Sequence, residues 1–172
     1  LKPANQWMDN LALRLSYGLQ GNIDKNTSPF LLGNYGNQTV IDKNETIITI
    51  GSAPNDKLRW EKTASYNAGI DLSVLKSAIN LSIDYYYRRG SDLIGYKDLP
   101  LENGFSSQAI NWASMENKGV EINLETRNIT TKDFSWSTTF NFAYNNNKVL
   151  KDHKKENSPT PGLEGYPVGT IF

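Results

Sequence analysis

Residues 66–88 read YNAGIDLSVLKSAINLSIDYYYR, and this stretch decides the fold. Apolar side chains alternate with polar or small ones from Tyr66 to Val74 and again from Ile79 to Tyr87. Because successive side chains of a β-strand point to opposite faces, each half is predicted to be a strand with one apolar face. The short link at residues 75–78 joins the two halves into a hairpin.

The same period of two appears in three further stretches. Apolar residues occupy alternate positions in residues 10–18, 120–125 and 134–145. Residues 45–50 are a weaker candidate, because they lie within a long polar segment. The sequence therefore predicts five strands, or six with the weaker one, in an all-β antiparallel meander.

The connections between the predicted strands alternate in length. Long polar segments lie near residues 19–56, 89–115 and 146–172, whereas the links at 75–78 and 127–133 are short. In an antiparallel meander this order places every long connection at one end of the sheet. Outer-membrane barrels show this asymmetry, with long extracellular loops and short periplasmic turns.

Aromatic residues support a membrane setting. Tyr66, Tyr87 and Tyr144 each stand eight residues from the far end of their apolar run, near the end with the long connections. Eight residues at a rise of ~3.3 Å, tilted by ~40°, climb roughly 20 Å, which is close to the ~25 Å apolar band of a barrel. The three tyrosines are therefore predicted to form one aromatic level, and Phe134 and Trp136 the opposite one.

The polar faces of the strands are predicted to line a wet lumen. Six residues carry this prediction: Asn67, Asp71, Asp84, Glu121, Asn123 and Glu125. They would be costly against a dry core unless each were paired. A soluble β-sandwich, such as a carbohydrate-binding module, would instead pack the apolar faces together and leave these residues in water. Alternation alone leaves both readings open.

Composition excludes several classes of protein. The 172 residues include 18 Lys and Arg, 18 Asp and Glu, one His and no Cys, so neither nucleic-acid binding nor a cysteine-based metal site is expected. Phosphate-binding loops, nucleophile elbows and metalloprotease motifs are lacking. Glu121 and Glu125 lie about 13 Å apart by strand rise, too far for a glycosidase pair. We expect no enzyme, cofactor or metal.

Three residues are candidates for contact with a substrate or a partner. Phe105 and Trp112 lie in the second long segment, and Arg88 immediately precedes it. Exposed aromatic side chains stack on sugars and anchor protein interfaces. Packing within the segment is the alternative for Trp112.

A series of short motifs resembles one known family. In chain order they are LRWEKT (58–63), NAGIDL (67–72), DYYYR (84–88), DLI (92–94), LPL (99–101), ENKGVE (116–121), DFSW (133–136) and GYPVG (165–169). The series resembles the barrel of the SusC/RagA-like TonB-dependent transporters of Bacteroidetes outer membranes. Each motif is weak alone, whereas the ordered series is specific.

The resemblance implies a 22-stranded transmembrane barrel with an N-terminal plug. Such a transporter lies in outer-membrane lipid, works with a SusD-like surface lipoprotein, is energised by TonB through the plug region, and imports glycans or peptides. Residues 1–172 would then be a partial barrel domain with no plug. Because the smallest membrane barrels need about eight strands, we expect this chain to be a piece of a larger protein.

Overall fold

The computed structural model describes residues 7–23, 25, 27–40, 43–152 and 162–171. The elements in these residues are β1 (Met8–Asn22), β2 (Gly33–Val40), β3 (Lys43–Ile50), β4 (Glu61–Val74), β5 (Ile79–Asp98), the short 3-10 turn η1 (Leu101–Asn103), β6 (Ser107–Thr130) and β7 (Ser135–Lys151). The prediction of an all-β fold is confirmed.

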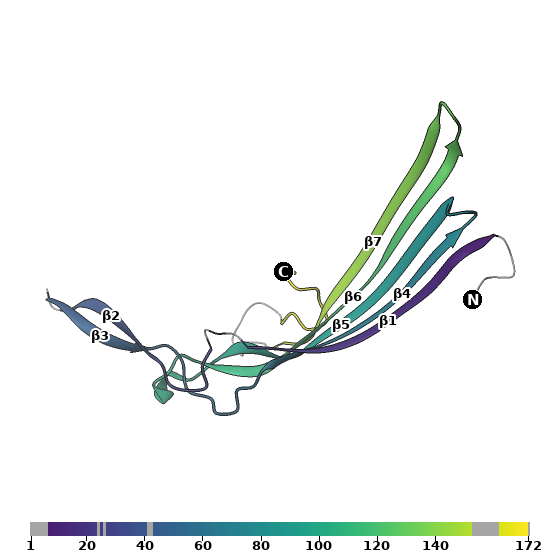
Figure 1. Cartoon of the computed structure of the whole chain (residues 1–172). Helices are drawn as coiled ribbons and strands as arrows, with labels where there is room; N and C mark the ends of the chain where they lie inside the picture. The colour runs from purple at the N-terminus through teal and green to yellow at the C-terminus, as the bar shows by residue number, and fades with distance from the viewer. Residues whose placement is uncertain (1–6, 24, 26, 41–42, 153–161, 172) are drawn as a thin grey trace. The chain divides into compact units, whose positions relative to one another are not determined.

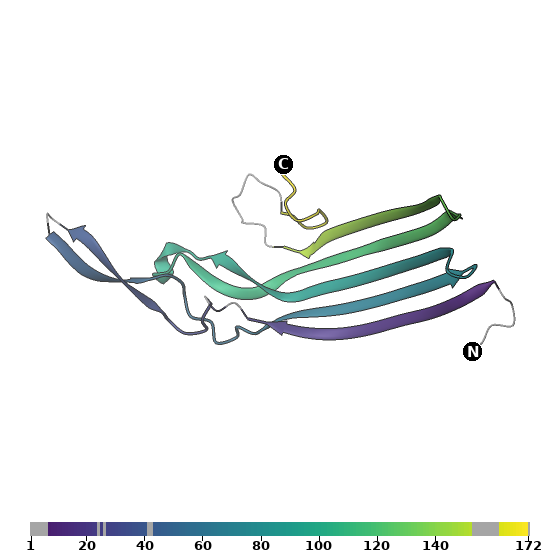
Figure 2. The ribbon, with the colours of Figure 1, turned by 45° about the horizontal axis from the view of Figure 1, so that its top comes forward.

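Five of the strands form one sheet in the order β1-β4-β5-β6-β7, as Figures 1 and 2 show. Strands β2 and β3 form a separate antiparallel hairpin, in which Gly33 pairs with Ile50 and Val40 with Lys43. This hairpin is inserted in the connection between β1 and β4. The fold is therefore the predicted antiparallel meander with one inserted hairpin. The sequence predicted a strand at β3 of this hairpin but none at β2.

Several strands extend beyond the apolar alternation. Within residues 89–115, β5 continues to Asp98 and β6 begins at Ser107, so only residues 99–106 separate them. The apolar alternation ends at Tyr87, because residues 88–92 carry no apolar side chain, and within the continued β5 Asp92 has a left-handed φ of 55°. Parts of the segments near 19–56 and 146–172 lie outside the described residues.

The chain folds as two compact units. Unit 1 comprises Leu1–Leu19, Ala64–Arg89 and Glu116–Lys148, and unit 2 comprises Gln20–Thr63, Gly90–Met115 and Val149–Phe172. The meander strands each contribute residues to both units. The predicted strand faces belong to unit 1.

The link between β4 and β5 is a turn in which three consecutive residues are left-handed. Leu75, Lys76 and Ser77 have φ values of 56°, 58° and 57°. Neighbouring strands fasten this turn: Arg127 of β6 donates to the carbonyls of Lys76 and Ser77 at 2.6 and 3.2 Å, and the carboxylate of Asp9 accepts from the Ser77 amide at 2.8 Å. These charge-assisted bonds stabilise a backbone that is uncommon outside glycine.

Glycines in the strands leave room for side chains of the adjacent strand. A Cβ at Gly119 of β6 would lie 2.5 Å from both the Tyr86 hydroxyl and the Tyr144 carbonyl oxygen. In unit 2, a Cβ at Gly95 of β5 would lie 2.5 Å from the indole nitrogen of Trp112. An aromatic ring that covers a glycine in the next strand is a recognised way to stabilise a sheet.

Unit 1 has no apolar core among its described residues. The buried apolar side chains of the described chain are Ala53, Ala109 and Val149, and all three belong to unit 2. Leu15 of β1 and Phe140 of β7 are 84% and 53% exposed. A soluble sandwich would bury these residues against a second sheet, so the structure contradicts the alternative of a soluble β-sandwich module.

Candidate functional site: the polar face of unit 1

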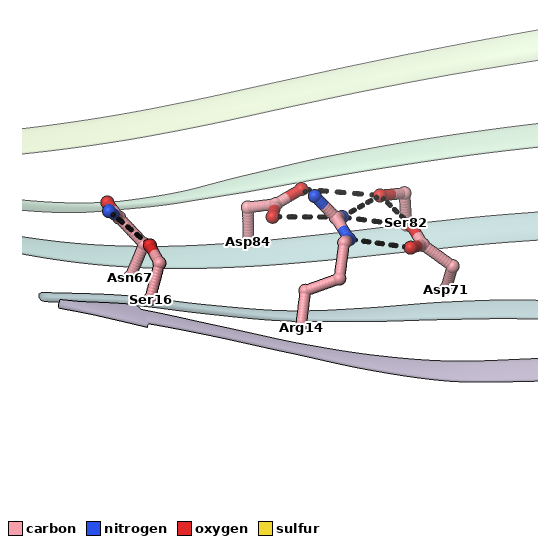
Figure 3. A network of polar contacts seen from close by, with 6 residues as sticks. All are labelled: Arg14, Ser16, Asn67, Asp71, Ser82 and Asp84. Atoms are coloured by element: carbon pink, nitrogen blue, oxygen red, sulfur yellow. Dashed lines mark hydrogen bonds and ion pairs between the residues drawn. The ribbon is translucent and has the colours of Figure 1, made fainter.

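A single arginine joins three strands on the polar face of unit 1. Arg14 of β1 donates through Nε and Nη2 to the two carboxylate oxygens of Asp71 in β4, at 2.7 and 3.0 Å. Its Nη2 also lies 3.0 Å from a carboxylate oxygen of Asp84 in β5. The Ser82 hydroxyl donates to Asp71 at 2.8 Å, and Figure 3 shows all four side chains meeting above the ribbon. We call Arg14, Asp71, Ser82 and Asp84 the Arg14 cluster.

The local sequence explains why the Arg14 cluster forms. Gly69 lies beside it, and a Cβ there would collide with the Asp84 carboxylate and approach the Arg14 guanidinium within 3.0 Å. Two carboxylates on adjacent strands repel each other, and the planar guanidinium fork offsets this by binding both. The Arg14 and Asp71 side chains remain 52% and 36% exposed, so the cluster fixes the register of the strands more than it stabilises the fold.

The structure brings all six residues predicted to face a lumen onto this one surface. The Asn67 amide donates to the Ser16 hydroxyl at 3.0 Å, next to the Arg14 cluster (Figure 3). The six residues line two hollows. The larger, of about 530 Å³, is lined by residues that include Asn67, Asp84 and Glu121, and the smaller, of about 310 Å³, by residues that include Asp71, Asn123 and Glu125.

Arg88, a candidate contact residue, is exposed and lines the larger hollow together with Asp84 and Glu121. Both signs of charge therefore converge on one water-accessible surface. Such a surface can accept a polar ligand that carries donors, acceptors or charges of either sign.

The other two candidate contact residues lie in unit 2. Phe105 is half-buried in the connection before β6. Trp112 is half-buried within β6, with its indole over Gly95. This position matches the alternative that Trp112 packs within its own segment.

The opposite face of unit 1 is apolar and exposed. The Tyr17 and Tyr66 rings lie 4.8 Å apart, and the Tyr66 and Tyr87 rings lie 6.1 Å apart. Tyr66 and Tyr87, two of the three tyrosines predicted to form one aromatic level, therefore lie side by side, and Tyr17, which was not predicted to belong to this level, joins them. Its signal was available, since Tyr17 continues the odd-position pattern of β1.

Unit 2 contains a second polar cluster that sequence reasoning missed. Asp92 accepts from Arg59 at 3.1 Å and lies 3.2 Å from the Lys62 ammonium. The Asn111 amide donates to the carbonyls of Arg59 and Asp92 at 2.6 and 2.7 Å, and its oxygen accepts from the Arg59 amide at 2.7 Å. Here a side chain replaces part of a strand ladder, which no short motif signals. This cluster ties the residues before β4 to β5 and β6.

The part of the chain that the structure describes contains no group of three or more His, Cys, Asp or Glu side chains arranged to hold a metal ion. It also contains no helix that is both long and apolar enough to cross a membrane.

Comparison with known proteins identifies the family. The family model described as "TonB dependent receptor-like, beta-barrel" matches residues 4–171. The chain belongs to this family. This match confirms the resemblance that the short motifs indicated. Because TonB-dependent receptors are outer-membrane transporters, it also confirms two further predictions: that the chain is a barrel segment in the outer membrane, and that it is not an enzyme.

Individual relatives agree with the family. The receptor segment is 37% identical over 141 residues to "TonB-dependent receptor P3" of Formosa agariphila, covering 80% of this chain and 14% of that protein. It is 34% identical over 157 residues to "TonB-dependent receptor SusC" of Bacteroides thetaiotaomicron, covering 88% of this chain and 16% of that protein.

Solved structures agree as well. The receptor segment superposes on a chain of the RagAB peptide transporter with a TM-score of 0.73 and 29% identity, covering 95% of this chain and 18% of the other. The same importer in its open-open state gives a TM-score of 0.74. The chain thus spans less than a fifth of the length of these relatives.

Proposed function

We propose that this chain forms part of the wall of a nutrient importer in the bacterial outer membrane, with its polar face toward the lumen and its apolar face toward lipid. One observation carries the proposal. The six polar residues lie on one face with Arg14 and Ser82, whereas Leu15, Tyr17, Tyr66 and Phe140 lie exposed on the other face. A barrel wall needs this division, because its two faces meet water and hydrocarbon.

The proposal includes the organisation of the parent protein. Residues 1–172 form part of a barrel domain, and the segments near 19–56, 89–115 and 146–172, including the strand residues that lie within them, are on the exterior side. The parent barrel has 22 strands, and its plug lies outside this chain. The inequality of the connections supports this orientation: the described turns at residues 75–78 and 131–134 are short, whereas a whole hairpin is inserted between β1 and β4.

The substrate class follows from the relatives and from the lumen surface. We infer import of peptides or glycans, together with a SusD-like surface lipoprotein and energised by TonB through the plug. The 29% identity to the RagAB peptide transporter and the 34% identity to SusC support this inference. Arg88, Asp84 and Glu121 in the larger hollow provide the mixed charge that a passing peptide requires, and Phe105 and Trp112 are proposed contacts on the exterior side.

Adjacent arginines with opposite orientations provide the test. In the full-length transporter, Arg88→Gln is expected to lower the uptake of labelled peptides or oligosaccharides roughly fivefold, because it removes a cation from the lumen surface. Arg89→Gln changes the neighbouring residue, which points to the other face, and is expected to leave uptake unchanged. Uptake is measured in a deletion strain that is complemented with each variant at equal surface abundance.

Two results would count against the proposal. The first is equal uptake by both variants and the unmodified protein. The second is a deletion strain that takes up every peptide and glycan mixture as fast as its parent strain. Co-purification of a surface lipoprotein with the full-length protein tests the partner separately.

A further inference from the structure

The tyrosine row on the outer face of unit 1 ends beside charged residues. Tyr17, Tyr66 and Tyr87 come from β1, β4 and β5, which are consecutive in the sheet. The Tyr87 hydroxyl donates to the Glu116 carboxylate of β6 at 3.2 Å. The row therefore continues onto a fourth strand through a polar contact.

Three basic residues stand at this level of the outer face. Gly119 lies against Tyr86, so in these antiparallel strands Lys118 is the neighbour of Tyr87. Arg89 follows Tyr87 by two positions on the same face of β5. On β7, Asn146 donates to the Tyr144 hydroxyl at 3.4 Å, which places both on one face, and Lys148 is the next residue on that face. We call Arg89, Lys118 and Lys148 the basic band.

The basic band has an excess of positive charge. All three side chains are exposed, and none forms an ion pair with another described residue. Glu116 is the acidic residue at this level, and its carboxylate accepts from Tyr87. The band therefore carries three cations against one anion.

The charges begin where the apolar surface stops. On the outer face, β5 is uncharged from Ile79 to Tyr87, and β6 is uncharged from Val120 to Thr126. Beside the tyrosine row lies an apolar hollow of about 450 Å³, lined by residues that include Leu15, Tyr17 and Tyr85. Acyl chains fit such a hollow, and the headgroups of the same lipids would lie at the level of the basic band.

We propose that the basic band binds the phosphate groups of a phosphorylated glycolipid in the outer leaflet. The inference rests on the proposed function, because in that orientation the apolar face of unit 1 meets lipid and the end with the basic band lies toward the cell exterior. Arginine and lysine near a membrane surface are attracted to anionic headgroups, and each strengthens binding by about fivefold. Tyrosines at the interface place their rings in the apolar layer and their hydroxyls among the headgroups.

Lipid binding to the purified full-length protein tests the proposal. The probes are bisphosphorylated lipid A, the same lipid with both phosphates removed, and inorganic phosphate. The unmodified protein is expected to bind bisphosphorylated lipid A, and the triple variant R89Q/K118Q/K148Q is expected to bind it about 100-fold more weakly. The matched control K57Q/K76Q/K132Q removes three exposed lysines outside the band and should retain the affinity.

Each result has a defined meaning. Equal affinity of the two triple variants, equal binding of the dephosphorylated lipid, or competition by inorganic phosphate at equal concentration would overturn the proposal. The variant R89K/K118R/K148R keeps the charges and should bind normally, and single variants give an expected loss of about fivefold each if the triple variant does not assemble. Uptake is measured separately, so failure of lipid binding with normal uptake refutes only the basic band.

Discussion

Replacing Phe140 with Arg in the full-length receptor is expected to destabilise the barrel by about 2 to 4 kcal/mol. Phe140 lies in β7 on the outer face and is 53% exposed. A guanidinium at the bilayer midplane loses its hydration and gains no partner there. The measurement is the free energy of unfolding in urea, with the protein inserted in lipid vesicles. Ile83→Arg in β5 should behave in the same way.

The matched control is Asn123→Arg. Asn123 lines the smaller hollow on the polar face with Asp71 and Glu125, so an arginine there has water and two carboxylates nearby. Its expected change in unfolding free energy is within about 0.5 kcal/mol. Equal destabilisation by Phe140→Arg and Asn123→Arg would contradict the assignment of the two faces.

Gly119→Ala is expected to cost about 1 to 3 kcal/mol through overpacking. Its Cβ would lie 2.5 Å from the Tyr144 carbonyl oxygen, which belongs to the backbone of β7 and cannot rotate away. The new methyl group also meets the Tyr86 hydroxyl at 2.5 Å. The strand pair β6–β7 must therefore separate locally or displace the tyrosine. The measurement is again the unfolding free energy in vesicles.

Gly18→Ala provides the comparison for this prediction. Gly18 is also a strand glycine, in β1, and a Cβ there meets no atom within 4 Å. Alanine at this position is expected to be neutral or slightly stabilising, because it reduces the conformational entropy of the unfolded chain. If both variants unfold at the same urea concentration as the unmodified protein, the close packing at Gly119 is wrong.

The sequence predicted the strand faces because alternation is a local property. Residues 66–88 determined the β4–β5 hairpin and its short turn, and the side of each strand then followed from counting by two. For this reason all six predicted polar residues reached one surface. The same counting separated Arg88 from Arg89.

Alternation along a strand does not predict which side chains of different strands contact each other. Arg14 is 57 residues from Asp71 and 70 from Asp84, and their contact depends on the register of three strands and on the missing side chain of Gly69. Strand β2 escaped prediction because its sequence, GNYGNQTV, lacks alternation and depends on pairing with β3. The continuation of β5 beyond Tyr87 was hidden because residues 88–92, RRGSD, contain no apolar side chain and so show no alternation.

The two faces of β7 allow a direct measurement of the central claim. Phe142 and Asn141 are adjacent in this strand, Phe142 on the outer face and Asn141 in the smaller hollow of the polar face. A nitroxide label is attached to Phe142→Cys or Asn141→Cys in the full-length receptor, which is then inserted in a lipid bilayer. The account predicts that the label at 142 collides with dissolved oxygen and is shielded from a water-soluble nickel chelate, whereas the label at 141 shows the reverse. Accessibility to the nickel chelate at 142 equal to that at 141 would contradict it.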